Sequence, residues 1–427
     1  MALGGGTFTT QNKVLPGAYI NVISAARASA TLGERGVAAL PLPLKWGTGG
    51  EVITVTATEF TKNSMQIFGY DYMAAEMQPL REVFKKAQKA HVYNLSSGVK
   101  ATCSKYATAK QAGSRGNDLK LVIQKNIDNE TLFDVSVYLG TTAVYKQTVA
   151  STSALKENPY VEWTTSDVLA ESAGLAFTGG TDGTVDTAAY QAALNKLESY
   201  NFNSLACPDA SVAQLYVEFT KSMRDDVGVK FQTVVPKTMN ADYHGVVQLA
   251  DEQAAALYWA TGAIAGCDIN KSNTNMLYDG ELEIPCNETQ SELEQRIAAG
   301  VFMFHKVEDE THVLLDINSY VSFTDEKNEL LSSNQTIRVT DQCASDDART
   351  FNKKYLGKVQ NDASGRVSFW GDIVTHRKQL EAKRAIENYN PDELSVTLGN
   401  SKGAVEVNDA ITIVGTMEKL YMTSVIS

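Results

Sequence analysis

The sequence lacks the compositional features of several protein classes. It has only 9 prolines and 30 glycines in 427 residues, and 43% of its residues are hydrophobic. This balance excludes collagen-like, low-complexity and wholly disordered chains. The longest uncharged apolar run, residues 254–267, has about 14 residues and is shorter than the roughly 18 that a membrane helix needs. We therefore predict a folded, multidomain protein that does not insert into a membrane.

Secretion and disulfide signals are also missing. Residues 1–12 contain no basic region followed by an apolar core, so we expect a cytoplasmic origin. The cysteines are odd in number, lie far apart and form no C-x-x-C pair, which argues against a disulfide framework or a zinc knuckle. We expect reduced, mostly buried thiols at Cys103, Cys207, Cys267, Cys286 and Cys343.

The chain is acidic, with 38 Lys and Arg against 50 Asp and Glu and a net charge of -12. The charge is spread along the sequence, which argues against nucleic acid as a partner. One late basic cluster departs from this balance, on a long helix predicted over residues 366–389. Two explanations stay open, a solvated helix face or a stripe that faces an acidic partner. The cluster consists of His376, Arg377, Lys378, Lys383 and Arg384.

Residue patterns divide the chain into six segments and predict a mixed α+β and α/β multidomain fold. Short β-branched runs separated by turn signals indicate an antiparallel β-sandwich. The alternation of helices and strands that follows indicates βα units and a largely parallel sheet. The segments are an N-terminal arm (1–25), an α+β domain (26–98), the β-sandwich (99–172), the α/β domain (173–320), a C-terminal domain (321–414) and a C-terminal arm (415–427).

The individual elements follow from the same patterns. In the α+β domain we predict strands at 52–56 and 91–95 and a helix at 74–90, and in the sandwich strands at 119–124, 132–139 and 142–149. The α/β domain has predicted helices at 187–200, 211–226, 252–265 and 289–299, and strands at 204–207, 230–235, 246–249 and 301–305. The last domain has predicted helices at 346–359 and 366–389 and strands at 394–398 and 405–414.

Each end of the chain has a strand-like run with no obvious partner. Residues 18–23 and 417–426 have high β-propensity, but neither has a turn and a second strand next to it. Such runs either fray or add to the sheet of another molecule.

Motifs that carry catalysis or cofactor binding are absent from the sequence. The five histidines match no metal-binding spacing, and there is no P-loop, nucleophile elbow or dinucleotide fingerprint. We predict no catalytic residue, no metal and no cofactor. His305 and His312, with Glu308 and Glu310 between them, indicate a solvated hairpin.

Two weaker patterns have both a functional and a structural interpretation. One glycine-rich run could bind phosphate through backbone N–H groups, but we favour a structural turn that joins two domains. This run contains Gly179, Gly180, Asp182 and Gly183. The other resembles a calcium loop but lacks its central glycine and bidentate glutamate, so we predict no calcium site. Its oxygens come from Asp268, Asn270, Ser272, Thr274 and Asp279.

Five segments, in the same order along the chain, resemble contractile tail sheath proteins of bacteriophages. The resemblance is to the compact sheaths of Gram-positive phages, defective prophages and phage-tail-like bacteriocins, and it is spread over most of the chain. The segments are 5–23 (GGTFTTQNKVLPGAYINVI), 83–106 (VFKKAQKAHVYNLSSGVKATCSKY), 113–123 (GSRGNDLKLVI), 177–184 (FTGGTDGT) and 417–423 (MEKLYMT).

The resemblance implies a structural protein and not an enzyme. Subunits of this family stack as six-membered rings around an inner tube and contract on a baseplate trigger, which drives the tube through the target envelope. The implied partners are other copies of the chain, the tube protein, and baseplate and tail terminator proteins. The sheath would assemble in the host bacterial cytoplasm and belong to a virion tail or a released tail-like particle.

The resemblance also implies roles for particular residues. The inner domain, made from both chain ends, would contact the tube through Arg377, Lys378, Lys383 and Arg384. The α/β insertion would have a subtilisin-like shape without catalysis. The two arms would each add a strand to a neighbouring subunit, through Ala18, Tyr19, Ile20, Asn21, Val22, Ile23, Lys419, Leu420, Tyr421, Met422, Thr423 and Val425.

Two other functions remain as alternatives at this point. The first is a hydrolase that uses the α/β domain, with Asp182 and either His244 or His305 as acid and base. The second is a shell protein that exchanges strands but does not contract.

Overall fold

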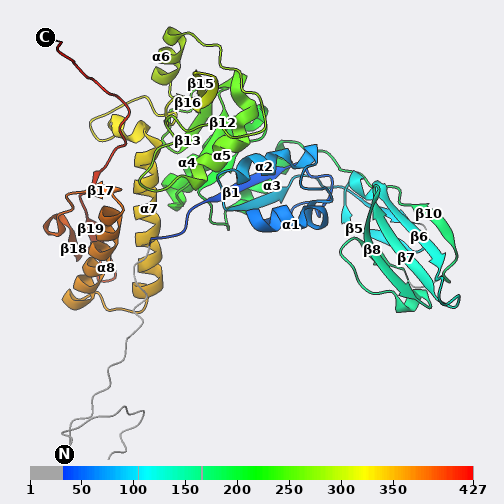
Figure 1. Cartoon of the computed structure of the whole chain (residues 1–427). Helices are drawn as coiled ribbons and strands as arrows, with labels where there is room; N and C mark the ends of the chain where they lie inside the picture. The colour runs from blue at the N-terminus through cyan, green and yellow to red at the C-terminus, as the bar shows by residue number, and fades with distance from the viewer. Residues whose placement is uncertain (1–31, 104, 165–166, 427) are drawn as a thin grey trace, which may run out of the picture. The chain divides into compact units, whose positions relative to one another are not determined.

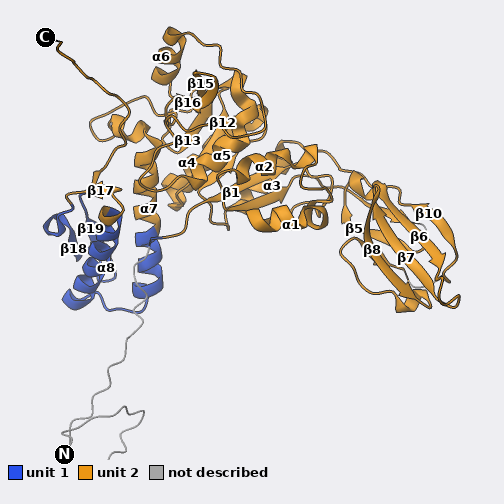
Figure 2. Cartoon of the chain, in the orientation of Figure 1, with its two compact units in different colours: residues 1–32, 346–380, 389–410 blue, residues 33–345, 381–388, 411–427 orange. Residues whose placement is uncertain are grey.

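The computed structural model describes residues 32–103, 105–164 and 167–426. The chain divides into two compact units, which Figure 2 shows in different colours. Unit 1 consists of residues 1–32, 346–380 and 389–410, and unit 2 consists of residues 33–345, 381–388 and 411–427. The described residues form a mixed fold with several sheets, as predicted, whereas the predicted strand at 18–23 lies outside them.

A seven-stranded sheet forms the centre of unit 2 (Figure 1). Its order is β14-β13-β12-β11-β1-β3-β2, and all neighbours are parallel except β2 and β3. The strands are β1 (Val37–Leu42), β2 (Val52–Thr56), β3 (Lys89–Asn94), β11 (Ser204–Ala206), β12 (Gln232–Pro236), β13 (Val246–Leu249) and β14 (Val301–Phe302).

This sheet differs from the prediction of separate domains at 26–98 and 173–320. Strand β1 pairs in parallel with β11, with Ala38 opposite Ser204, so the two segments share one sheet. Strand β1 was not predicted, and it contains Pro41, although proline is unfavourable in a central strand. The prediction of a largely parallel sheet is confirmed, with two more parallel strands than expected.

Helices pack against both faces of the sheet. Leu40 and Ala39 are successive residues of β1 and belong to different apolar clusters, as the two-residue period of a strand requires. One cluster includes side chains of α1 (Ala57–Phe68), α2 (Gln78–Phe84) and α5 (Leu257–Gly266). The other includes side chains of α3 (Thr187–Leu197) and α4 (Ala213–Ser222).

Most predicted helices of unit 2 are confirmed with shorter ends, including α6 (Gln290–Ala298). The helix predicted over 74–90 is too long at its end, because α2 ends at Phe84 and residues 89–94 pair with both β1 and β2 as β3. Helix α1 was not predicted, although Thr56 and Glu59 form a capping box at its start.

The second part of unit 2 is the predicted β-sandwich. One sheet has the order β10-β6-β7-β8 and the other β4-β5-β9, and Ile123, Val137 and Ala109 belong to the single core between them. The strands are β4 (Lys100–Cys103), β5 (Ala107–Ala112), β6 (Leu119–Lys125), β7 (Phe133–Leu139), β8 (Thr142–Val149), β9 (Val161–Trp163) and β10 (Ser172–Ala176).

The remaining elements come from the C-terminal third of the chain. Helix α7 (Asn334–Thr350) and helix α8 (Ala363–Ala382) replace the helices predicted at 346–359 and 366–389. His305 lies opposite His312 in a hairpin, as expected. The strands are β15 (Phe304–Val307), β16 (Glu310–Val313), β17 (Ile386–Glu387), β18 (Ser395–Leu398), β19 (Val405–Asn408) and β20 (Thr412–Ile413).

Short helical turns complete the described structure. The 3-10 turns lie at Ala75–Met77, Ser114–Asp118, Thr152–Ala154, Ala210–Val212, Asp251–Ala256, Glu329–Ser332 and Pro391–Glu393. The π-helical turns lie at Met223–Val227 and Phe351–Tyr355.

The glycine-rich run 177–184 packs against the run 113–118. The carboxylate of Asp182 accepts hydrogen bonds from the backbone N–H of Ser114 at 2.6 Å and from its hydroxyl at 2.7 Å. Gly183 has a φ of 71°, in the left-handed region that favours glycine. A Cβ on Gly180 would lie 2.6 Å from the carbonyl oxygen of Gly113. These residues therefore join the sandwich to the rest of unit 2, and the Asp182 carboxylate is used for structure.

We predict that Asp182→Ala destabilises this connection. The substitution leaves the backbone N–H and the hydroxyl of Ser114 without their acceptor, so the free energy of unfolding should fall by about 1–3 kcal/mol. Urea unfolding followed by tryptophan fluorescence measures the change. Asp128→Ala, in an exposed loop of the same sandwich, is the control and should change stability by less than about 0.5 kcal/mol. Equal midpoints for Asp182→Ala and the unmodified chain would contradict the assigned role.

Candidate assembly surfaces

The most exposed apolar segment is the end of the chain, residues 417–426, which we call the tail. Figure 1 shows it as an extended segment after β20. It makes no strand pairing among the residues that the structure describes, and it contains all six C-terminal arm residues predicted from the sequence. Exposed apolar side chains grouped in this way are typical of surfaces that contact another molecule. Six of its side chains are at least 76% exposed, namely Met417, Leu420, Tyr421, Met422, Val425 and Ile426.

One buried side chain holds the chain just before the tail. The amide of Gln335, on α7, donates to the carbonyl of Val414 at 2.9 Å and accepts from the N–H of Thr416 at 3.2 Å. The N–H of Val414 donates to the carbonyl of Ala385. The direction of the chain is therefore fixed up to Thr416, and no sequence pattern indicated this role for Gln335.

The hairpin β18–β19 in unit 1 has two open edges. Its strands pair from Ser395 with Asn408 to Leu398 with Val405, and neither pairs with a third strand in the described part of the chain. Leu398 and Val407 are 52% and 38% exposed. A two-stranded sheet is marginally stable alone, and an open edge can pair with another strand.

The four basic residues predicted to form one stripe on the long helix do not share one exposed helix face in the structure. Helix α8 ends at Ala382, and Arg384 has a φ of 60°, so Lys383 and Arg384 do not continue its face. Lys378, Lys383 and Arg384 are exposed. Arg377 is only 4% exposed and cannot present its charge to a partner in this structure.

Arg377 instead belongs to a buried ion network in unit 1. Its guanidinium donates to Asp409 at 2.7 Å, to Asp347 at 2.5 Å and to Nδ1 of His376 at 2.7 Å. Because Nδ1 accepts this bond, Nε2 of His376 carries the proton that it donates to Asp346 at 3.0 Å. The carboxylates lie about 30 residues away in sequence, so no local pattern could reveal them.

The network extends to Tyr389, the last residue of the helix predicted over residues 366–389. The hydroxyl of Tyr389 donates to Asp409 at 3.3 Å. Burial, followed by the nearby Asp409 carboxylate, raises the pKa of Tyr389. Tyr389 therefore stays neutral and remains a hydrogen-bond donor.

The residues proposed for a hydrolase do not form a site. Asp182 binds Ser114, and His305 faces His312 across a hairpin. Burial, with a smaller contribution from Arg224, lowers the pKa of His244 to about 4, so this imidazole is neutral near pH 7. No hydrogen bond or ion pair joins these residues to one another in the described ranges, and no cluster of three or more His, Cys, Asp or Glu there could hold a metal ion.

Two further expectations concern thiols and membrane helices. The structure pairs none of the five cysteines, and four are buried while Cys286 is partly exposed, so the expectation of mostly buried thiols is confirmed. Burial raises the pKa of Cys207 to about 12, so its thiol stays protonated. Among the described helices, none is both long and apolar enough to cross a membrane.

We predict that Arg377→Ala strongly destabilises unit 1. Removing the guanidinium leaves the partly exposed Asp347 and Asp409 carboxylates without their shared cation and Nδ1 of His376 without its donor, so the free energy of unfolding should fall by about 1–3 kcal/mol. Lys378→Ala removes the adjacent but exposed charge and should change stability by less than about 0.5 kcal/mol. Calorimetry compares the two, and equal transition temperatures would show that the network contributes nothing.

A second prediction concerns the chain just before the tail. Gln335→Leu removes the acceptor for the Thr416 N–H, so hydrogen exchange of this amide should become about tenfold faster. Gln342→Leu is the matched control, because Gln342 is also buried on α7 but its amide donates to Gly33. Unchanged exchange at Thr416 in Gln335→Leu would mean that this side chain does not fix the chain there.

Four family models match consecutive parts of the chain. They are the tail sheath protein Gp18 domain III N-terminal region (residues 35–95), the phage tail sheath protein beta-sandwich domain (96–182), the phage tail sheath protein central domain (183–319) and the phage tail sheath C-terminal domain (326–427). The second of these coincides with the sandwich seen in the structure.

Individual proteins are similar over nearly their whole length. The crystal structure of the sheath tail protein from Desulfitobacterium hafniense is 33% identical, covers 94% of this chain and 98% of its own, and has a TM-score of 0.83. The phage-like element PBSX protein XkdK from Bacillus subtilis (strain 168) is 28% identical over 98% of this chain and 99% of its own. The contracted helical sheath of the anti-feeding prophage shares the fold alone, at 11% identity and a TM-score of 0.54, over 97% of this chain and 99% of its own.

These similarities agree with the resemblance seen in the sequence and decide between the open alternatives. The hydrolase hypothesis is set aside, because the matching families and the related proteins are structural components of phage tails. The chain belongs to the phage tail sheath protein family and is a structural subunit of a phage tail or tail-like particle, not an enzyme.

Proposed function

We propose that this chain polymerises into a contractile sheath by adding its terminal arms as strands to neighbouring subunits. The observation that supports this proposal is that the subunit has both an exposed apolar tail and a hairpin whose two edges lack a neighbouring strand in the described chain. Strand addition supplies backbone hydrogen bonds with few demands on side chains, so it can link many identical subunits.

The hairpin β18–β19 is the best acceptor among the small sheets. It offers four paired residues on each strand, whereas β17 and β20 have two residues each. One strand of the hairpin β15–β16 also makes a bridge between His312 and Leu277. A third strand on β18–β19 would convert a marginal two-stranded sheet into a more stable one.

The tail is the donor that the structure describes. Its backbone N–H and C=O groups make no strand ladder in the described chain, and its apolar side chains lie in water. The N-terminal arm, with Ala18–Ile23 as its strand, is the second proposed donor and lies outside the described residues.

The proposed assembly consists of six-membered rings stacked around an inner tube, with baseplate and terminator proteins at its ends. The exposed cations Lys378, Lys383 and Arg384 are the proposed contacts to an acidic tube surface. Exposed ion pairs contribute roughly 0–1 kcal/mol each, which suits a surface that must release the tube. Arg377 is left out of this contact because it is buried.

Contraction is the proposed work of the assembly. A protein with the same fold forms the contracted helical sheath of the anti-feeding prophage, which supports a similar action here. Free energy stored during assembly would be released when the subunits change their packing, and such two-state behaviour is typical of interfaces between packed bodies.

We predict that deleting residues 416–427 abolishes polymer formation. Without the tail there is no donor strand at this end, so the chain should stay monomeric or form short oligomers. Negative-stain electron microscopy and pelleting of the chain expressed alone and with its tube protein measure the result. A second variant replaces residues 417–426 by a glycine-serine segment of equal length, which keeps chain length but removes the β-propensity and the apolar side chains of the donor strand.

The outcomes separate the sheath from a passive shell. A sheath should lose its tubes in both variants and keep its fold, as shown by an unchanged thermal transition. Loosened but complete particles would favour a non-contractile shell. Normal tubes after deletion of both residues 1–17 and residues 416–427 would rule out strand exchange.

A further inference from the structure

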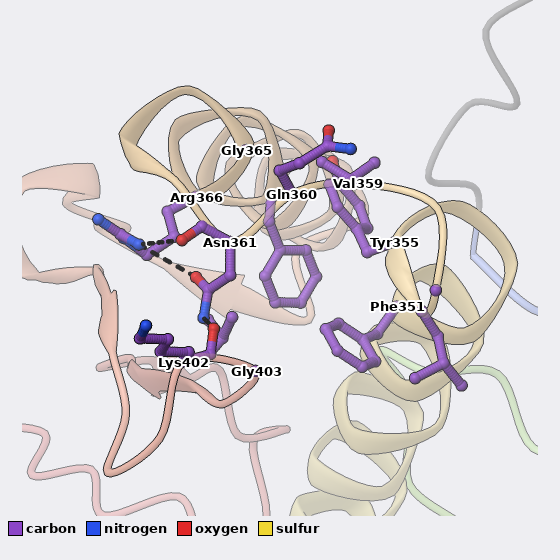
Figure 3. Close-up of a pocket in the computed structure, with 13 residues that line it drawn as sticks. Phe351, Tyr355, Val359, Gln360, Asn361, Gly365, Arg366, Lys402 and Gly403 are labelled. Carbon is purple, nitrogen blue, oxygen red and sulfur yellow. Dashed lines mark hydrogen bonds between the residues drawn. The ribbon is translucent and has the colours of Figure 1, made fainter.

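Unit 1 contains a cavity of about 250 Å³ beside the hairpin β18–β19. Its walls come from the π-helical turn after α7, the loop that follows, the start of α8 and the loop between β18 and β19. Figure 3 shows Phe351 turned toward the cavity, with Asn361, Lys402 and Gly403 on the opposite side. The cavity is smaller than the roughly 300–1,000 Å³ of a typical ligand pocket, so its size suits one or two amino-acid side chains.

The cavity is built for an apolar group. The rings of Phe351 and Tyr355 each lie within 5.5 Å of the Phe369 ring, measured between centroids. Three of the polar side chains that line it, those of Tyr355, Asn361 and Arg366, have partners within unit 1. The hydroxyl of Tyr355 donates to Asp372 at 2.6 Å, and the guanidinium of Arg366 donates to the side-chain oxygen of Asn361 at 3.0 Å.

The rim of the cavity is exposed and apolar. Leu356 is 57% exposed and Val359 is 42% exposed, and both line the opening. Large apolar side chains grouped around a cavity indicate a surface that another protein segment covers.

The cavity is continuous with the proposed acceptor hairpin. Gly403 and Val405 line it, and Val405 is the first residue of β19. The side-chain amide of Asn361 donates to the carbonyls of Lys402 at 3.1 Å and Ala404 at 2.7 Å, which fixes this end of the hairpin against the cavity wall. A strand added to the hairpin would therefore pass next to the opening.

We infer that this cavity receives the side chain of Met422 from the tail of a second copy of the chain, with Leu420 against the rim at Leu356 and Val359. The inference rests on the proposed strand exchange and names the side-chain contact that would anchor it. The occupant is the tail because it carries six exposed apolar side chains within ten residues, more than any other described segment of that length.

The choice of residues follows from the geometry of a strand. Alternate side chains of an extended segment point to the same side, so Leu420 and Met422 lie together and Tyr421 points away. Methionine is flexible and its sulfur makes favourable contacts with aromatic rings, which suits walls made of Phe351, Tyr355 and Phe369. Backbone pairing with the hairpin would set the direction of the tail, and the Met422 side chain in the cavity would set which tail residue lies opposite which hairpin residue.

Photocrosslinking in assembled polymer tests the contact. Benzoylphenylalanine is placed at position 422 of the full chain, and unlabelled and ¹⁵N-labelled copies are mixed before assembly. After irradiation, mass spectrometry should find position 422 crosslinked to peptides within residues 351–369. Some of these products should join one labelled and one unlabelled peptide, which shows that the two peptides come from different copies of the chain. The probe at position 421, on the opposite side of the strand, is the matched control and should give at least about tenfold less of this product.

A second comparison tests the acceptor. Leu356→Asp places a charge at the rim and should lower both the crosslink and the pelleted polymer by about tenfold or more. Leu356 is exposed, so the variant should keep its thermal transition. Val367→Asp is the matched control, because Val367 is 66% exposed near the start of α8 but does not line the cavity, and it should leave both unchanged.

The failures of the two proposals are distinguishable. Crosslinks to 351–369 that join only peptides of the same label would mean that the tail enters the cavity of its own chain, which overturns the inference. If tail deletion abolishes polymer but position 422 does not crosslink to 351–369, strand exchange stands and the cavity is not its anchor. Equal crosslinking from positions 421 and 422 would overturn the assigned register.

Discussion

The parallel pairing of β1 with β11 is the contact on which the body of this subunit depends. It joins residues 38 and 204 and makes one sheet from two segments that are far apart in sequence. The sandwich lies between these segments, so the chain must leave the sheet and return to it nearby. Closing so long a loop has an entropic cost. Close packing at the return supports it, since a Cβ on Gly98 would lie 1.8 Å from the carbonyl oxygen of Thr181.

Because of this pairing, the core of unit 2 is complete within one chain and does not depend on assembly. The sheet buries both faces under helices, and its large side chains, such as Trp259 and Tyr216, are fully covered within unit 2. The longest run of exposed apolar side chains in the described chain lies elsewhere, on the tail, and the strands β18 and β19 have open edges. A subunit of this kind can fold before it polymerises, because its core does not need a neighbour.

The sequence predicted well those strands whose position depends on nearby residues. Alternating β-branched residues and clear turns located β6, β7 and β8 almost to the residue, and β13 has the predicted bounds. Strand β1 was not predicted, because its position between two parallel neighbours depends on residues far away in sequence and its run contains Pro41. The tail was predicted as a strand without a partner. Arg377 was misplaced because its burial is decided by carboxylates on other elements.

The placement of charge and backbone groups fits a sheath whose contacts have different lifetimes. Exposed cations near the end of α8 interact weakly and are screened over about 8–10 Å at physiological salt. Backbone pairing and a buried anchor are screened far less, because they do not rely on exposed charge. Gln335 fixes the chain up to Thr416, so any change of direction between body and tail must occur after this residue. Under the proposed mechanism, contacts with the tube would therefore yield before the links between subunits.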